Sequence, residues 1–110
     1  LATLINVKPI ISLDSDGRII EAGRVIGLNR LWKKTVGLSI HYAEQVVDPR
    51  IQIAHALDEE RAEWFRDRIK SIFPGKDIPI VEASPALGLH AGIGSIAVAV
   101  LGDPAHQLRV

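Results

Sequence analysis

The sequence contains no cysteine and no methionine among its 110 residues, and its charges cancel. Without cysteine, disulfide frameworks, thiolate zinc sites and cysteine nucleophiles are excluded. Thirteen lysine and arginine residues balance thirteen aspartate and glutamate residues, so no net charge favours binding to nucleic acid or to an anionic membrane surface. The absence of methionine leads us to expect that the chain is one part of a longer protein.

Long apolar runs and common catalytic motifs are also missing. No stretch approaches the roughly 18 consecutive apolar residues of a membrane-spanning helix, and no segment has the pattern of a signal peptide. The sequence has no P-loop, no H-E-x-x-H zinc motif and no recognisable context for a nucleophilic serine. We therefore expect a cytoplasmic, non-enzymatic protein without a membrane span, a metal ion or another cofactor.

Apolar residues are abundant for a chain of this length. They make up 47% of the sequence, and the mean hydropathy is +0.19. A chain of 110 residues is long enough for one domain with a core of its own. The excess of apolar residues indicates that part of the apolar surface faces a partner or an apolar ligand.

Strand and helix signals alternate along the first half of the chain. Residues 5–13 and 18–25 are predicted to form a hairpin, because Asp14-Ser15-Asp16-Gly17 favours a turn between them. Apolar residues then recur at helical spacing from Gly27, and Asp48-Pro49 is predicted to end this helix.

The second half continues the alternation. A helix is predicted from Asp58, a favourable N-cap, to Pro74-Gly75. Apolar strands are predicted at 51–57, 78–83 and 96–101, and the uniformly apolar last one is expected in the middle of a covered sheet. Because helices between strands indicate crossovers, we expect an α/β fold with a mixed sheet of about five strands and two main helices.

Between the last two strands, one histidine lies among glycines in Gly88-Leu89-His90-Ala91-Gly92-Ile93-Gly94-Ser95. Glycines permit positive φ and close approach of a ligand to the main chain. Free N–H groups in such a turn can hold an anion, and the imidazole can donate a hydrogen bond to it. The segment suits a carboxylate or phosphate group; the alternative is a tight turn with a surface histidine. His55, at the end of a predicted strand, is interpreted as a partly buried histidine with a hydrogen-bond partner.

Three segments in order resemble the DegV family. Leu4-Ile5-Asn6-Val7-Lys8-Pro9-Ile10-Ile11 is similar to the family's LLNIKPIL segment, and Asp16-Gly17-Arg18-Ile19-Ile20 resembles its DGKI hairpin. Ser84-Pro85-Ala86-Leu87-Gly88-Leu89-His90-Ala91-Gly92-Ile93-Gly94 is similar to its GPVIGAHTGPG segment. The spacing agrees as well, so the resemblance implies that residues 1–110 form the C-terminal lobe of a two-lobe fold whose N-terminal lobe is not in this chain.

The resemblance implies a bacterial protein that holds a long-chain fatty acid in a tunnel between its two lobes. Some members present the lipid carboxylate to a separate fatty acid kinase. In such members the histidine that matches His90 hydrogen-bonds the carboxylate, and hydroxyl groups of the N-terminal lobe complete the site. The candidate ligand-binding residues are His90, Gly88, Gly92, Gly94, Ser95 and Lys8.

Two other functions stay open. The chain could be a substrate subunit like those of dihydroxyacetone kinases, which bind a small ketone covalently through a histidine. It could also be a structural lobe whose apolar face only docks the missing half. A ketone site would be small and polar, whereas this sequence is rich in apolar residues.

Overall fold

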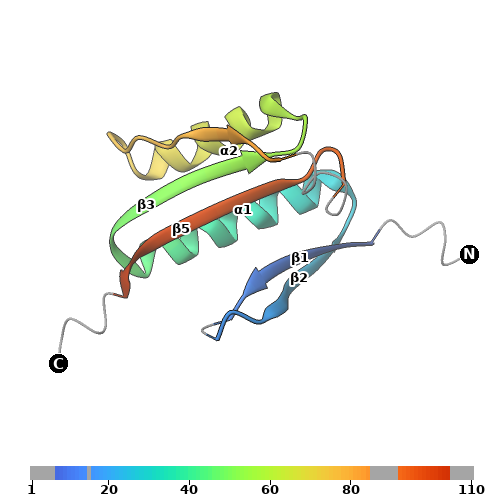
Figure 1. Ribbon diagram of the computed structural model, residues 1–110, viewed down its shortest axis with the longest axis horizontal. Helices are drawn as coiled ribbons and strands as arrows, with labels where there is room; N and C mark the ends of the chain where they lie inside the picture. Colours follow the sequence, from blue (N-terminus) through green and yellow to red (C-terminus); the bar gives the residue numbers. More distant parts are fainter. Residues whose placement is uncertain (1–6, 15, 85–91, 105–110) are drawn as a thin grey trace, which may run out of the picture. The chain divides into compact units, whose positions relative to one another are not determined.

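A computed structural model describes residues 7–14, 16–84 and 92–104, which form two helices and five strands (Figure 1). The chain divides between Leu38 and Ser39 into two compact units. The alternation of strands and helices confirms the α/β class. No helix within these described ranges is long and apolar enough to cross a membrane.

The first unit consists of a β-hairpin and the first part of a helix. Strand β1 (Val7–Leu13) pairs antiparallel with β2 (Ile19–Ile26), and helix α1 (Leu28–Glu44) follows directly. A Cβ added to Gly23 in β2 would lie 2.6 Å from Cε of Lys34 in α1. Glycine at this position therefore lets the lysine stem lie against the strand.

The hairpin turn forms as its residue types predict. The Asp14 carboxylate accepts hydrogen bonds from the backbone N–H groups of Asp16 and Arg18, both at 2.9 Å. Gly17 takes a φ of 80°, which glycine adopts without steric cost. The aspartate side chain thus replaces a backbone acceptor inside the turn.

The second unit contains a three-stranded sheet and helix α2 (Glu59–Ile72). Its strand order is β4 (Ile80–Glu82), β3 (Val46–His55) and β5 (Ile96–Pro104). Strand β3 pairs parallel with β4 and antiparallel with β5. The three strands predicted in the second half of the sequence are therefore neighbours in one mixed sheet.

The five strands are divided between two sheets, one of two strands and one of three. This division is not visible in the sequence pattern, because the periodicity of a strand does not specify its partner. The expectation that β5 lies in the middle of a covered sheet was wrong: β5 is an edge strand and β3 is central. Ala97 and Ala99 of β5 are exposed, so its uniform apolar character reflects small residues on an open face.

The boundary between α1 and β3 also differs from the expectation. The helix ends at Glu44, and β3 begins at Val46 and continues through Asp48 and Pro49. The register with β5 shifts between Val47 and Arg50. Proline lacks the N–H group that a sheet ladder needs, and such an irregularity in the register accommodates it.

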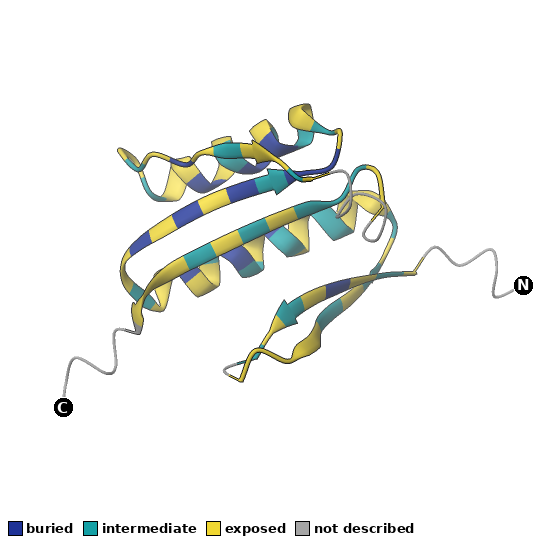
Figure 2. Cartoon of the chain, viewed as in Figure 1, coloured by how far each residue is buried: buried dark blue, intermediate teal, exposed yellow. Residues whose placement is uncertain are grey.

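The core of the second unit lies between α2 and β3. Phe65 and Ile69 of α2 and Ile53 of β3 are almost completely buried. Along β3, buried and exposed residues alternate (Figure 2). Burying one such large apolar side chain contributes about 1.5–3 kcal/mol to folding, so this packing holds the sheet and the helix together.

Candidate functional site

The end of β3 lies beside the end of β4 and the start of β5. His55, the last residue of β3, pairs with Glu82 in the parallel strand β4 and with Ile96 at the start of β5. In open α/β sheets, ligands bind beyond the carboxyl ends of parallel strands. The predicted glycine-rich segment connects β4 to β5 at this edge, so the edge is the candidate site.

The described part of that segment is a tight turn. Gly92 and Gly94 have φ values of 94° and 90°. The Ser95 hydroxyl donates a hydrogen bond to the Gly92 carbonyl at 2.7 Å, and the Ser95 N–H donates to the same carbonyl at 3.3 Å. A Cβ on Gly94 would meet no heavy atom within 4 Å. The positive φ values, rather than lack of space, therefore require glycine here.

Backbone hydrogen bonds tie both sides of the segment 84–91 to the end of β3. On one side, the Ala83 N–H donates to the His55 carbonyl at 2.7 Å. On the other side, the Gly94 N–H donates to the Ala56 carbonyl at 2.7 Å, and the Ala56 N–H donates to the Ser95 carbonyl at 3.0 Å. Two adjacent residues, His55 and Ala56, thus hold the chain on both sides of this segment.

The residues after β3 form a turn that leads into α2. The Asp58 N–H donates to Nδ1 of His55 at 3.0 Å, and the Asp58 carboxylate accepts from the Arg61 N–H at 3.2 Å. His55 is only 6% exposed. Because Nδ1 is the acceptor, neutral His55 carries its proton on Nε2. Leu57, between them, takes a φ of 57°, which costs a non-glycine residue about 1–2 kcal/mol.

The structure brings three of the predicted site residues together in one turn: Gly92, Gly94 and Ser95. Lys8 lies in β1 of the first unit, half-buried and opposite Val25 in the hairpin register. His90 and Gly88 lie outside the described residues. The interpretation of His55 as a buried histidine with a hydrogen-bond partner is confirmed.

The sequence did not lead us to expect that residues 55–58 hydrogen-bond to the chain on both sides of the glycine-rich segment. The available signal was a histidine at the end of an apolar strand, three residues before an aspartate N-cap. That spacing permits an imidazole to accept from the N–H of the capping residue. The partner segments, Ala83 and Gly94–Ser95, are distant in sequence and could not be identified from it.

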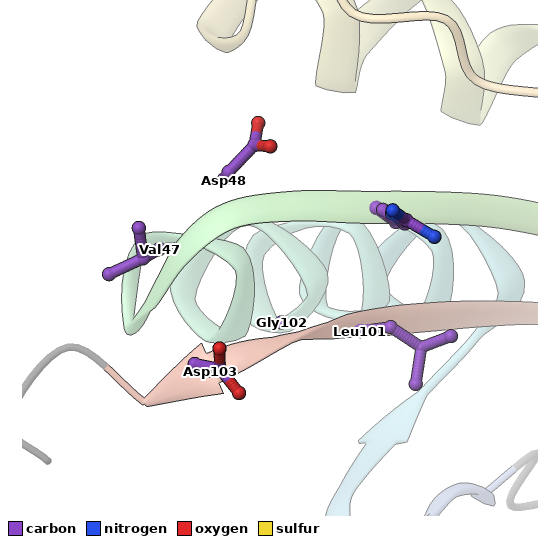
Figure 3. Close-up of a pocket in the computed structure, with 6 residues that line it drawn as sticks. Val47, Asp48, Leu101, Gly102 and Asp103 are labelled. Carbon is purple, nitrogen blue, oxygen red and sulfur yellow. The ribbon is translucent and has the colours of Figure 1, made fainter.

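A hollow of about 450 Å³ lies at the other end of β3, lined by residues of β3 and β5 (Figure 3). Its lining residues are Val47, Asp48, Arg50, Leu101, Gly102 and Asp103. In Figure 3 the Asp48 carboxylate points away from β5, whereas Asp103 projects from the end of β5. Their charges do not converge on one point.

Asp48 in this hollow is already paired with Lys76. The hydrogen bond and the positive charge of Lys76 lower the pKa of the Asp48 carboxyl below its ordinary value. Within the described part of the chain, no three histidine or acidic side chains are grouped to hold a metal ion. The hollow therefore has no arrangement suited to catalysis or metal binding, and the carboxyl end of β3 remains the candidate site.

Comparison with known proteins gives one family. A family model described as an uncharacterised protein of the DegV family matches residues 1–103. A DegV domain-containing protein of Clostridium perfringens is 30% identical over 106 residues, which are 94% of this chain and 35% of that protein. The chain spans about a third of the length of the curated relatives that it matches.

Solved structures share the fold. A fatty acid binding DegV family protein from Streptococcus agalactiae has a TM-score of 0.78 at 19% identity, over 93% of this chain and 36% of its own. A DegV family protein from Ruminococcus gnavus, refined with vaccenic acid, has a TM-score of 0.68 at 26% identity. That match covers 87% of this chain and 34% of the other.

Proposed function

The chain belongs to the DegV family, and from that premise we propose that it forms one lobe of a fatty-acid-binding protein. The observation that carries the proposal is the fatty acid found with a relative of the same fold, the vaccenic acid of the Ruminococcus gnavus protein. The second lobe would be the N-terminal lobe that the resemblance to the family implies; the chain spans about a third of the length of its curated relatives. A long-chain fatty acid would lie between the two.

An exposed face of the three-stranded sheet, on which Arg50 and Gln52 of β3 lie beside the alanines of β5, supports this proposal. On this face the register pairs β3 with β5 as Arg50–Leu101, Gln52–Ala99 and Ala54–Ala97. The opposite face, which carries Ile51 and Ile53, is buried. Alanine side chains leave a shallow surface on which an extended acyl chain can lie. Each methylene removed from water would contribute roughly 0.8 kcal/mol, so this wall would supply affinity.

The same face leads to the glycine turn at the carboxyl end of β3, and we place the lipid carboxylate there. The N–H groups of Gly94 and Ser95 already donate within the protein. They are therefore not available to an anion, and in this proposal Gly92, Gly94 and Ser95 shape the turn. We propose that His90 contacts the carboxylate, together with Gly88 and hydroxyl groups of the other lobe.

The proposal includes a partner kinase that would receive the presented carboxylate, as the family resemblance implies. Lys8 remains a candidate contact of lower rank, because its place in the hairpin supports no particular ligand. The covalent ketone site of a dihydroxyacetone-kinase-like subunit gains no support from the described residues.

The test is a substitution of His90 in the protein that carries both lobes. We expect His90→Ala to weaken oleate binding by about 1.5–3 kcal/mol, the range for a hydrogen bond to a charged group. Binding of oleyl alcohol, which has no carboxylate, should change much less. His41→Ala, on an exposed position of α1, is the matched control. Equal losses for acid and alcohol would show that His90 does not contact the carboxylate.

A further inference from the structure

We propose that the free edge of β5, the edge that does not pair with β3, binds a second copy of this chain. The two β5 strands would pair antiparallel, with Val98 on the two-fold axis. Within the described ranges, no strand pairs with this edge. An unpaired edge presents a row of N–H and C=O groups to which another strand can bond. The inference goes beyond lipid binding and does not depend on it.

The two edge strands of this sheet differ in how open they are to another strand. Strand β4 has three residues, follows Pro79 and ends at the exposed Glu82. Short length, proline and charge are features that prevent pairing at a sheet edge. Strand β5 has nine residues, and its segment 96–101 contains neither a charged residue nor a proline. The β5 edge therefore lacks the protection that the β4 edge has.

Hydrogen bonds of β3 establish which of its residues direct their main-chain groups toward β5. The Ile53 N–H donates to the Pro79 carbonyl on the side of β4, at 3.0 Å. The Ala56 N–H donates to the Ser95 carbonyl on the side of β5, also at 3.0 Å. Successive residues of a strand direct their main-chain groups to opposite sides. Every second residue of β3, counted back from Ala56, therefore faces β5.

The register between β3 and β5 extends this alternation to β5. Gln52 and Ala54 face β5, where they pair with Ala99 and Ala97. The main-chain groups of these two alanines are thus used within the sheet. Each of the alternate residues directs one N–H and one C=O to the free edge: Ile96, Val98 and Val100.

These outward groups are complementary to the same groups of a second copy. With the axis at Val98, this residue pairs with itself, and Ile96 pairs with Val100 of the other copy. Residues paired at such positions exchange both hydrogen bonds, so all the outward groups of segment 96–100 find partners. An axis at Ala99 would place Ile96 opposite Gly102, beyond the part of β5 whose register with β3 is regular.

The side chains favour the same arrangement. Val98 and Val100 are half-buried and lie on the face of the sheet that carries Ile53 and Ile51. In the pair of strands they would lie beside valine and isoleucine side chains of the second copy, and the loss of exposed apolar surface would favour association. The alanines of β5 lie on the opposite face, where they offer neither bulk nor charge against a second copy.

Sedimentation equilibrium of the 110-residue chain at a series of concentrations tests the association. We expect wild type to show a reversible equilibrium between monomer and dimer. A wild-type chain that stays monomeric at every concentration would overturn the proposal, and the edge would then be left to another lobe or to a different partner.

Charges on the exposed alanines test the register, because position 97 of one copy lies opposite position 99 of the other. The double variants Ala97→Lys/Ala99→Lys and Ala97→Glu/Ala99→Glu would each bring like charges together. We expect the dissociation constant of each to rise about tenfold, and a mixture of the two to recover association. Two lysines at exposed positions outside the strands, Gln45→Lys/Ser71→Lys, are the control and should leave dimerisation unchanged. Folded double variants that dimerise as wild type does would overturn the interface.

Single cysteines test the axis without added charge. The chain contains no cysteine, so a disulfide in a single-cysteine variant can only join two copies. Across the axis, the Cα atoms of Val98 would be about 5.5 Å apart, within reach of a disulfide. Those of Val100 would be more than about 13 Å apart.

The two cysteine variants are matched, because both positions are half-buried valines on one face of β5. In the same glutathione buffer, we expect Val98→Cys to form the disulfide-linked dimer at least about tenfold faster than Val100→Cys. Equal rates, or faster cross-linking of Val100→Cys, would overturn the proposed pairing even if the chain dimerises.

Discussion

The two units of the chain bury their apolar residues to very different degrees. In the three-stranded unit, Phe65, Ile53 and Ile69 are nearly inaccessible to solvent. In the hairpin, Leu13 is 65% exposed and Ile19 is 75% exposed, although both are large aliphatic residues. The same chain therefore contains one region with a core of its own and another whose apolar side chains remain open.

The hairpin register places these exposed apolar residues opposite one another on the two strands. Leu13 pairs with Ile19, and Val7 pairs with Ile26, so their side chains share the outer face of the two strands. A two-stranded sheet is at best marginally stable alone. Apolar residues in α2 and β3 therefore stabilise the fold. Within the described residues, those on the outer hairpin face contribute little to the free energy of folding.

The strongest test of this difference is a pair of truncations. We expect Phe65→Ala to destabilise the protein by about 3–5 kcal/mol, because it leaves a cavity between α2 and β3. Ile19→Ala should change the free energy of unfolding by less than about 0.5 kcal/mol, the usual range for exposed positions. Urea unfolding followed by the fluorescence of Trp64, which contacts Phe65 edge-on, measures both. Similar losses would mean that the hairpin face is buried as well.

A second pair of substitutions compares how backbone conformation affects the free energy of unfolding. It uses two glycines at which an added Cβ would have no neighbour within 4 Å. Gly75, after α2, has a φ of 87°, so Gly75→Ala should destabilise by about 1 kcal/mol or more. Gly37 lies inside α1 with no positive φ, so Gly37→Ala should stabilise by about 0.5–1 kcal/mol. Thermal unfolding distinguishes the two signs; a shift of both in the same direction would contradict the assignment.

The smallest expected effect concerns an exposed ion pair in each unit. Lys76 lowers the pKa of the Asp48 carboxyl below its ordinary 3.8. A group with a depressed folded pKa stabilises the folded state above the unfolded value, and this contribution disappears as the pH falls through the folded value. Stability measured from pH 5 down to pH 2 should therefore fall slightly more in wild type than in Asp48→Asn.

The matched pair in the hairpin is Arg24–Glu21, whose side chains are 63% and 43% exposed. Glu21→Gln should change the free energy of unfolding at neutral pH by less than about 1 kcal/mol, because solvent screens such pairs. High salt should reduce further the difference in the free energy of unfolding between wild type and Glu21→Gln. A change that is larger than this, or one that salt does not reduce, would show that the pair is shielded by other parts of the protein.

Local features of the fold could be predicted from the sequence. The start of α2 follows from Asp58 as an N-cap with acidic residues in the first turn, and the hairpin turn follows from Asp14 and Gly17. Positive φ at Gly92 and Gly94 also follows from residue type. Each of these depends on residues within a few positions of one another, where propensity and hydrogen bonding act directly.

Pairing between distant segments could not be predicted. The division into two sheets and the edge position of β5 depend on which strands meet, and an apolar strand does not encode its partner. At the candidate site, glycine types indicated a turn, but its attachment to Ala56 joins residues that are far apart in the sequence. His90 and Gly88 were predicted as site residues from the glycine-rich pattern and the family resemblance, and they remain predictions.

The position of β3 between β4 and β5 has a consequence for the order in which the unit can assemble. Ile53 meets Ile80 across the short crossover through α2, whereas Val46 meets Pro104, close to the end of the sequence. Closing the longer loop costs more entropy and slows the pairing. On a ribosome that synthesises the chain from its N-terminus, one edge of β3 stays unpaired until β5 emerges. During that interval β3 is an open template for another strand.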